Sequence, residues 1–247
     1  MAVLICIDDT DSLDSRGTGE LADLLAREVE SRGWGRCGSV TRHQLYVHPE
    51  IPYTSHNSSM CFIAEMDAAH LGALTEYASE FLAGESAEGS DPGLCIAVAE
   101  RLARPEALID YGYRAKRSVI EMQEAYMLAS AAGVHLSSHG GTGQGVIGAL
   151  AGVGLRLGGN DGRMRGSLVI PEVDGVATVR EILVHPEVDA VRTLEGVRLD
   201  PEDRVRFVDK VKTVLLGGKL VLLVVPDDSH AGSARWKTCT RKQLKEY

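Results

Sequence analysis

The chain opens on an apolar run that ends in a group of aspartates, Val3-Leu-Ile-Cys-Ile-Asp-Asp-Thr-Asp-Ser12. The apolar, partly β-branched residues 3–7 predict a buried central strand. Carboxylates at the carboxyl end of such a strand stand where open α/β sheets bind ligands. After the acidic turn, leucines recur at helical spacing, which predicts an amphipathic helix over residues 19–31 with Thr18 as its N-cap. Strand, acidic turn and helix together predict an α/β fold.

The rest of the first 158 residues alternates between short apolar runs and amphipathic segments. Strands are expected over residues 40–47, 60–66 and 94–98, and helices over residues 71–82, 117–132 and 146–151. This alternation is typical of helices packed in layers on a sheet. The predicted fold class is α/β (α+β), with a larger α/β domain followed by a smaller α+β domain.

The composition changes after residue 157, where Gly158-Gly-Asn-Asp-Gly162 is a turn or linker signal. Short β-rich runs follow over residues 167–170, 205–208, 211–215 and 219–225, with one helix expected over 178–184. We therefore predict two domains, residues 1–158 and residues 159–247. A ferredoxin-like arrangement is one option for the second domain. Its basic tail, residues 235–245, is interpreted either as a solvated helix or as a partner-binding arm.

The composition is that of an ordinary globular protein, with 247 residues, 44% of them apolar and 25% charged. It excludes collagen-like, coiled-coil and disordered classes. The formal net charge of −9 counts against a general nucleic-acid-binding surface, without excluding a local basic groove. No apolar run reaches the roughly 18 residues of a membrane span, and the start lacks the charged segment of a signal peptide. The five cysteines occur singly, so we expect reduced thiols in a cytoplasmic protein and no zinc ribbon.

Asp8, Asp9 and Asp11 are the strongest candidates for a functional site. Alternate residues of an extended chain point the same way, so Asp9 and Asp11 share a face while Asp8 points the other way or closes the turn. Two convergent carboxylates suit Mg²⁺, which prefers oxygen ligands and commonly bridges to phosphate. Like charges this close cost stability unless a cation relieves them. The alternative is an acidic turn that only caps the next helix.

A second candidate is the glycine-rich segment 139–145, His-Gly-Gly-Thr-Gly-Gln-Gly, which precedes a predicted helix. Its glycines Gly141, Gly143 and Gly145 would let backbone N–H groups approach a phosphate at the helix N-terminus. The segment lacks the G-K-[ST] of a Walker A loop. A glycine-rich turn that only packs tightly is an equal alternative.

Two further groups of residues have both a functional and a structural interpretation. Arg114, Lys116 and Arg117 are expected at a helix start, where they oppose the helix dipole and a bound phosphate would offset the cost. The alternative is a solvated basic face. His43, upstream of the polar segment 51–59, is a candidate for proton transfer, although a lone histidine is more often structural.

Taken in order along the chain, these motifs resemble the archaeal tRNA-isoleucine agmatinylcytidine synthetase family. The matching segments are Ile-Asp-Asp-Thr-Asp-Ser at 7–12, Arg-Gly-Thr at 16–18, Ile-Pro-Tyr-Thr at 51–54 with Asn57, Asp-Pro-Gly at 91–93, and Gly-Gln-Gly-Val-Ile-Gly-Ala-Leu-Ala at 143–151. The aspartate motif combined with the last block carries the resemblance, because the glycine block alone is not specific.

The resemblance implies an ATP- and Mg²⁺-dependent kinase-like domain. In that family the domain phosphorylates a cytidine so that agmatine displaces the phosphate, and it also phosphorylates one of its own threonines. Carried onto this sequence, Asp8, Asp9 and Asp11 would hold Mg²⁺, and Asp9, Asp11 and Thr18 would be catalytic, with Thr18 as the phosphorylated threonine. The residues expected to bind ATP are Asp8, Asn57, Gly141, Gly143 and Gly145.

The chain also departs from the family. It is too short for the family's OB-fold and zinc ribbon, and its cysteine pattern does not make a ribbon. Thr54-Ser-His-Asn57 replaces a basic Lys-Thr-Arg-Gly-Asn, and the loop between Ser12 and Arg16 is longer. Residues beyond 160 show no convincing match. The nucleotide site is therefore expected to persist without the modules that recognise tRNA.

We therefore predict a cytoplasmic ATP- and Mg²⁺-dependent phosphoryl-transfer enzyme with an unidentified acceptor. The net charge and the missing modules count against tRNA as a partner, no membrane partner is expected, and self-association is one further option. One alternative is a haloacid-dehalogenase-type phosphohydrolase with Asp9 as nucleophile and Asp11 as acid/base, supported by Asp227-Asp228 after an apolar strand. Another is a non-catalytic nucleotide-binding regulatory module.

Overall fold

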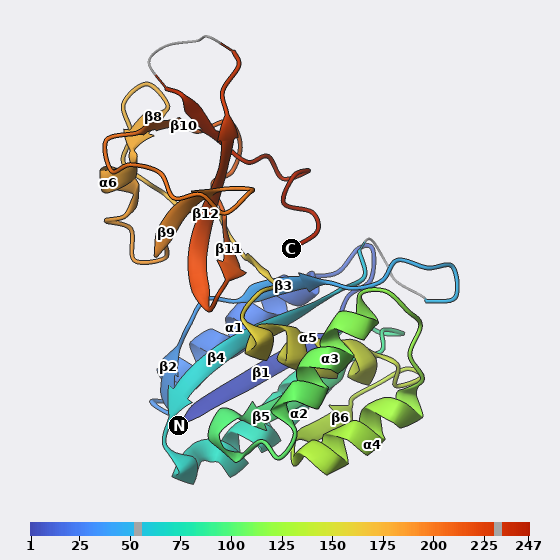
Figure 1. Cartoon of the computed structure of the whole chain (residues 1–247). Coiled ribbons are helices and arrows are strands. Elements are labelled where there is room, and N and C mark those ends of the chain that lie inside the picture. Colours follow the sequence, from blue (N-terminus) through green and yellow to red (C-terminus); the bar gives the residue numbers. More distant parts are fainter. Residues whose placement is uncertain (52–55, 230–233) are drawn as a thin grey trace. The chain divides into compact units, whose positions relative to one another are not determined.

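A computed structural model describes residues 1–51, 56–229 and 234–247 of the chain. The chain divides into two compact units, Met1–Gly158 and Gly159–Tyr247 (Figure 1). The mixed helix and strand content of both units confirms the predicted α/β class. None of the described helices is long and apolar enough to cross a membrane.

The first unit is built on an antiparallel sheet with the predicted strand, β1 (Ala2–Asp8), at its centre. The strand order is β6-β5-β1-β4-β3, and β2 also pairs with β4. The other strands are β2 (Gly35–Cys37), β3 (Thr41–Gln44), β4 (Ser58–Met66), β5 (Gly93–Val98) and β6 (His135–Ser138). The expected strands near residues 40–47, 60–66 and 94–98 are thus confirmed, and β6 is an element that the sequence analysis did not predict.

Helices cover both faces of this sheet, because β1 presents apolar side chains alternately to each side. Val3, Ile5 and Ile7 pack against α1 (Thr18–Ser31) and α2 (Leu71–Glu85). Leu4 and Cys6 face the opposite cluster. That second layer contains α3 (Pro105–Ala115), α4 (Met122–Ala132) and α5 (Gly145–Gly158). Short 3₁₀ turns, η1 (Ala68–His70) and η2 (Ala99–Arg101), lead into α2 and α3.

The helix predicted over residues 117–132 is confirmed as α4, which begins later, at Met122. The helix before it, α3, is an element that the sequence analysis did not predict. Pro105 at the first turn starts α3, since proline needs no backbone N–H there. Arg114 lies in the last turn of α3 and Lys116 is its C-cap. These cations therefore lie at a helix C-terminus, where they complement the helix dipole. Arg114 also pairs with Glu124 of α4, so Arg114 and Lys116 have a structural explanation that needs no phosphate.

α5 is packed on α3 backbone to backbone, through a glycine in its interior. A Cβ at Gly154 would lie 1.9 Å from the carbonyl oxygen of Leu108 on α3. Glycine is unfavourable inside a helix by about 1 kcal/mol relative to alanine. The close contact accounts for its presence here, since any side chain would force the two helices apart.

In the described part of the second unit, neighbouring strands are hydrogen-bonded in the order β7-β11-β12-β13-β10-β8, and β9 also pairs with β12. The pairs β9–β12 and β10–β13 are parallel, and the others are antiparallel. Its elements are β7 (Arg163–Met164), β8 (Val176–Thr178), α6 (Val179–Ile182), β9 (Ala190–Thr193), β10 (Arg204–Arg206), β11 (Thr213–Leu216), β12 (Lys219–Pro226) and β13 (Trp236–Thr238).

Several predictions for this unit hold and others are wrong. Strands form near residues 205–208, 211–215 and 219–225, and Thr178 caps α6 through a capping box with Glu181. Residues 167–170 form no strand, although the backbone of Leu168 bonds to that of Val211. The basic tail is no solvated helix, because it contributes β13 and then a turn in which Thr240 bonds to Gln243.

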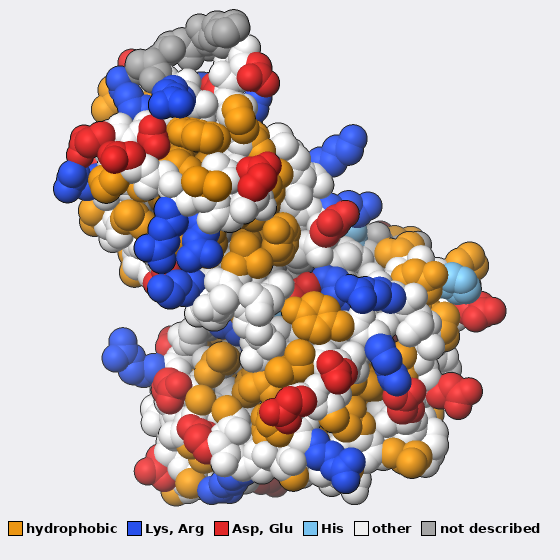
Figure 2. Space-filling model, in the orientation of Figure 1, with side chains coloured by type: hydrophobic (Ala, Val, Ile, Leu, Met, Phe, Trp, Pro, Cys, Tyr) orange, Lys and Arg blue, Asp and Glu red, His pale blue; other side chains and the backbone are white. Residues whose placement is uncertain are grey.

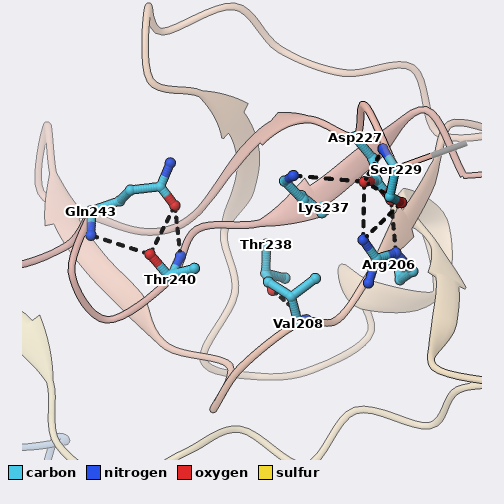
Figure 3. Close-up of polar contacts among 8 residues, drawn as sticks. All are labelled: Arg206, Val208, Asp227, Ser229, Lys237, Thr238, Thr240 and Gln243. Atoms are coloured by element: carbon cyan, nitrogen blue, oxygen red, sulfur yellow. Dashed lines mark hydrogen bonds and ion pairs between the residues drawn. The ribbon is translucent and has the colours of Figure 1, made fainter. Parts of the chain in front are cut away.

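A charged cluster ties three strands of the second unit together. Arg206 on β10 donates two hydrogen bonds to the carboxylate of Asp227, at 2.7 and 2.9 Å (Figure 3). Lys237 on β13 lies 3.7 Å from the same carboxylate, and the Ser229 hydroxyl donates to it. The Asp227 side chain is 1% exposed, and the hydrogen bonds from Arg206 and Ser229 hold its pKa well below its usual range. The cluster is a matched ion-pair network.

The second unit is small, and it leaves apolar side chains at its surface. Its buried side chains form two modest clusters, whereas Val169, Val173 and Val184 are 86%, 71% and 80% exposed. Figure 2 shows apolar side chains on the face of this unit that it draws. Small units bury a lower fraction of their surface than large ones.

The packing of α5 is tested by replacing one glycine. Gly154→Ala is expected to lower the free energy of unfolding by about 1–3 kcal/mol, because the added methyl group overlaps the backbone of α3. Urea unfolding followed by circular dichroism measures the change. The matched control is Gly72→Ala on α2, where a Cβ meets nothing within 4 Å and alanine is expected to be neutral or stabilising by up to about 1 kcal/mol. Equal effects of the two substitutions would contradict this packing.

Candidate functional site

The candidate site lies at the edge of the first sheet where β1 ends. Because the neighbouring strands are antiparallel to β1, both β4 and β5 begin at this edge. Asp8 is paired with Gly93, the first residue of β5, and Gly93 is paired with Ser138, the last residue of β6. The aspartate turn, Asn57 before β4, and the glycine-rich segment after β6 therefore all reach the same edge. We call Asp8, Asp9, Asp11 and Asp91 the acidic edge.

Asp8 is buried beneath α5. A Cβ at Gly148 would lie 1.7 Å from the Asp8 Oδ2 atom, so only glycine leaves room for this carboxyl group. Burial raises the pKa of Asp8 well above its usual value, and repulsion from Asp9 and Asp11 raises it further, against a hydrogen bond from the Asp9 backbone. The helix thus holds a carboxyl group in surroundings that disfavour its charge.

Asp9 combines an unusual backbone with an unfavourable electrostatic position. Its φ is +51°, in the left-handed region that few residues other than glycine adopt. Partial burial raises the pKa of Asp9 to about 6, with further repulsion from Asp91 and Asp11. Strain and repulsion at one residue are typical of functional sites.

The structure brings Thr18 and Asp11 together. The Thr18 hydroxyl donates to Asp11 Oδ1 at 3.3 Å and accepts from the Thr10 hydroxyl at 3.1 Å. The prediction of Thr18 as N-cap is wrong, because Gly17 is the N-cap and Thr18 is the first residue of α1. The threonine hydroxyl is therefore turned toward a carboxylate instead of a helix N–H. A carboxylate in this position orients the hydroxyl and is able to accept its proton.

Asp91 is a member of the acidic edge whose role the sequence analysis did not assign. Its carboxylate accepts hydrogen bonds from the Thr142 backbone N–H, from the Thr142 hydroxyl at 3.0 Å, and from the Gly143 backbone N–H at 2.8 Å. The glycine-rich segment thus folds around a carboxylate of this chain, and two of its N–H groups are engaged. Its signal in the sequence was the Asp91-Pro-Gly93 segment, which matched the family without an assigned function.

The predicted ATP-binding residues occupy different positions around this edge. Gly141 lies against the Asp91 carboxylate, Gly143 donates to it, and Gly145 begins α5 beside the backbone of Asp91. Asn57 donates from Nδ2 to the Tyr46 carbonyl at 2.6 Å. Asn57 thereby extends the pairing of β3 with β4, and its role in binding ATP stays a prediction.

Other residues singled out from the sequence lie outside the acidic edge. His43 is fully buried in β3 and bonds through Nε2 to the Thr41 hydroxyl at 2.8 Å, which is the structural alternative for a lone histidine. Residues 52–55, which include most of the Ile-Pro-Tyr-Thr segment, lie outside the described residues.

The acidic edge fits Mg²⁺ by the chemistry of its donors. Over residues 1–51, 56–229 and 234–247, no group of three or more His, Cys, Asp or Glu side chains is arranged to hold a metal by itself. Mg²⁺ usually takes only one or two carboxylates and completes its shell with water and substrate phosphates. Asp8 and Asp9 supply such oxygens. Burial is the main cause of their raised pKa values, and neighbouring aspartates add a repulsion that a cation would relieve.

Comparison with solved structures relates this fold to TiaS, a tRNA agmatidine synthetase. The apo structure of TiaS is 30% identical. The match covers 62% of this chain and 35% of the TiaS chain, with a TM-score of 0.54. The TiaS–tRNA–ATP complex is 30% identical over 62% of this chain and 36% of its own, with a TM-score of 0.55. The TiaS complex with tRNA, AMPCPP and agmatine is 25% identical. The match covers 80% of this chain and 49% of the TiaS chain, with a TM-score of 0.55.

The chain spans between about a third and a half of the length of these structures. No protein-family model and no curated protein matches it. The comparisons therefore establish a related fold. The activity and partners of the longer proteins do not follow from it.

The charge on Asp9 predicts a pH-dependent effect on stability. The pKa of Asp9 is raised from 3.8 to about 6 in the folded chain, so the unfolded state loses this proton first as the pH rises. The cost of the folded carboxylate therefore grows between about pH 4 and pH 6 and is complete above pH 6. Asp9→Asn is expected to raise the free energy of unfolding by about 1–3 kcal/mol near pH 7.5, and by less near pH 4.5.

Urea unfolding of both proteins at the two pH values, without divalent cations, measures this difference. Asp14→Asn, at an exposed position of the same loop, is the control and is expected to change stability little at either pH. A gain for Asp9→Asn that is equal at both pH values would contradict the electrostatic explanation and would assign the effect to the backbone of Asp9.

Proposed function

We propose that the chain is an ATP- and Mg²⁺-dependent phosphoryl-transfer enzyme whose active site is the acidic edge of the first unit. One observation carries the proposal: the Thr18 hydroxyl donates to the Asp11 carboxylate in the same turn as Asp8 and Asp9. The related fold of TiaS, solved in complexes with ATP and AMPCPP, supports ATP as the phosphoryl donor.

The carboxylates of Asp8 and Asp9 are the groups that would hold Mg²⁺. When bound, the ion neutralises phosphate charge and orients the phosphate oxygens. α5 fixes Asp8 from one side because Gly148 allows close contact. The repulsion among Asp9, Asp11 and Asp91 is relieved only in the loaded site, so binding of Mg²⁺ with ATP is favoured over binding of ATP alone.

Thr18 is the acceptor hydroxyl that this chain itself supplies. In the proposed step, Thr18 Oγ attacks the terminal phosphorus of ATP, the new Oγ–P bond forms, and the bond to the departing ADP breaks. The hydroxyl proton passes to the Asp11 carboxylate, to which it is already bonded at 3.3 Å. Positioning and charge neutralisation supply most of what phosphoryl transfer needs from a protein.

The acceptor beyond Thr18 is a small nucleophile or a nucleic acid. TiaS was solved with tRNA and agmatine, which makes tRNA one candidate. The net charge of −9 favours a small acceptor over a large polyanion.

The other two hypotheses are weighed by specific contacts. In the sequence, the phosphohydrolase hypothesis is supported by Asp227. In the structure, Arg206 and Lys237 bind this carboxylate in an ion-pair network of the second unit, which gives Asp227 a structural explanation. A regulatory module would bind ATP and leave Thr18 unmodified. Release of phosphate from p-nitrophenyl phosphate, lost in Asp9→Asn, would favour the phosphohydrolase.

Calorimetric titration with ATP tests the site. The wild-type protein is expected to bind ATP more tightly with Mg²⁺ than without it, because the cation relieves the repulsion at the acidic edge. Asp9→Asn is expected to weaken Mg²⁺-dependent binding by about tenfold or more, which corresponds to roughly 1.4 kcal/mol. Asp14→Asn is the control and should bind as the wild type does. Absence of ATP binding by the wild type with Mg²⁺ would overturn the proposal.

Mass spectrometry after incubation with ATP and Mg²⁺ tests the role of Thr18. The wild type and Thr18→Ser are expected to gain one phosphoryl group on residue 18, because serine keeps the hydroxyl beside Asp11. Thr18→Val should bind ATP without gaining the group at that position. ATP binding without any phosphorylation of the wild type would favour the regulatory module.

A further inference from the structure

Arg16 is the cation that the sequence places nearest to the aspartate turn. Residues 1–26 contain no other lysine or arginine, and the charged neighbours that shift the pKa values of Asp8 and Asp9 are all aspartates. Phosphoryl transfer relies on positive charge around the transferred group, which Mg²⁺ and basic side chains supply. Arg16 is therefore the first candidate for a side chain that supplies this charge.

The turn before α1 holds the backbone of Arg16 beside the acidic edge. The Ser15 hydroxyl accepts from the Ser12 backbone N–H at 2.7 Å, and the Ser15 backbone N–H donates to the Ser12 carbonyl at 3.3 Å. Gly17, the next residue after Arg16, is the N-cap of α1, and a Cβ there would lie 3.7 Å from Asp11 Oδ2. The backbone of Arg16 is thus fixed one residue away from a contact with the Asp11 carboxylate.

The Arg16 guanidinium forms an ion pair with Glu85, the last residue of α2. A backbone hydrogen bond from the Ala87 N–H to the Thr10 carbonyl, at 3.0 Å, keeps the end of α2 beside the aspartate turn. The Arg16 and Glu85 side chains are still 47% and 41% exposed. Exposed ion pairs contribute little to stability, because water screens them. The Arg16 side chain is therefore able to leave Glu85 at low cost.

Neither member of this pair is placed to stabilise its own helix. Arg16 precedes the N-cap of α1, where a cation opposes the helix dipole, and Glu85 ends α2, where an anion does so. Residues 82–85 of α2 contain no lysine or arginine that would offset Glu85. A phosphate beside Arg16 would be attracted by the guanidinium and by the N-terminus of α1 together. Glu85 is better explained as a resting partner of Arg16 than as a residue that stabilises α2.

We propose that Arg16 binds the terminal phosphate of ATP, and that Glu85 holds Arg16 while the site is empty. The inference rests on the proposed function, in which Thr18 Oγ attacks the terminal phosphorus. Two residues span at most about 7 Å of chain, so a phosphate that reaches Thr18 also comes within reach of the Arg16 side chain. On binding, the guanidinium exchanges the Glu85 carboxylate for phosphate oxygens, with which it forms paired hydrogen bonds. Glu85 therefore competes with ATP for Arg16.

Calorimetric titration of the full-length protein with ATP and with ADP, both with Mg²⁺, tests this exchange. Arg16→Gln is expected to weaken ATP binding by about tenfold or more and to leave ADP binding nearly unchanged, because ADP lacks the terminal phosphate. Arg16→Lys keeps the charge without the paired hydrogen bonds and should restore part of the affinity. Glu85→Gln is expected to tighten ATP binding by about two- to fivefold, since no carboxylate then competes for Arg16.

The double variant, Arg16→Gln with Glu85→Gln, is a second test of the same exchange. It is expected to bind ATP as Arg16→Gln does, because Glu85 acts only through Arg16. The matched control is the exposed ion pair between Arg180 and Glu202 in the second unit. Arg180→Gln and Glu202→Gln remove the same charges and should each leave ATP binding unchanged. Circular dichroism confirms that every variant is folded.

The outcomes separate this inference from the proposed function. A structural ion pair predicts that Arg16→Gln and Glu85→Gln change ATP binding in the same direction, and that result would overturn the exchange. Unchanged ATP binding in Arg16→Gln, or equal weakening of ATP and ADP binding, would overturn the role of Arg16. In these cases the proposed function still stands if Asp9→Asn weakens ATP binding. Absence of ATP binding by the wild type would overturn both.

Discussion

The close contact of α5 with its two neighbours is the constraint on which the first unit depends. Gly154 lets α5 meet the backbone of α3, and Gly148 leaves room for the Asp8 carboxyl group at the end of β1. Side chains at these two positions would overlap neighbouring atoms, so the helix has little freedom to shift. The same contact that stabilises the fold therefore removes water from Asp8 and raises its pKa.

Repulsion between like charges marks the proposed active site. At the acidic edge, Asp91 is satisfied by Thr142 and Gly143, while Asp9 keeps a raised pKa through burial and repulsion. The network around Asp227 shows what a structural ion pair looks like in this chain, because each of its charges has a partner. Repulsion within a group of like charges is therefore the feature that separates the acidic edge from a stabilising contact.

Elements with a clear hydrophobic periodicity were predictable from the sequence. Elements whose position or ends depend on contacts with other segments were not. Periodicity predicted β1, α1, β4, α2 and β5 near their observed positions. It began α4 at residue 117 instead of Met122, because apolar spacing alone does not locate the end of the turn between α3 and α4. It also predicted a strand over residues 167–170, where a single apolar run lacks a full hydrogen-bonded partner. Thr18 was misread as an N-cap because Asp11 competes for its hydroxyl.

The sequence by itself determined the central strand, the acidic turn after it and the glycine-rich segment before α5, because each depends on local residue types and spacing. Tertiary structure alone decided that Asp91 joins the acidic edge and that Gly148 faces Asp8. The physical reason is that antiparallel pairing and close helix packing bring together residues far apart in the chain. Their register is set by the burial of both faces of the sheet, which no local pattern contains.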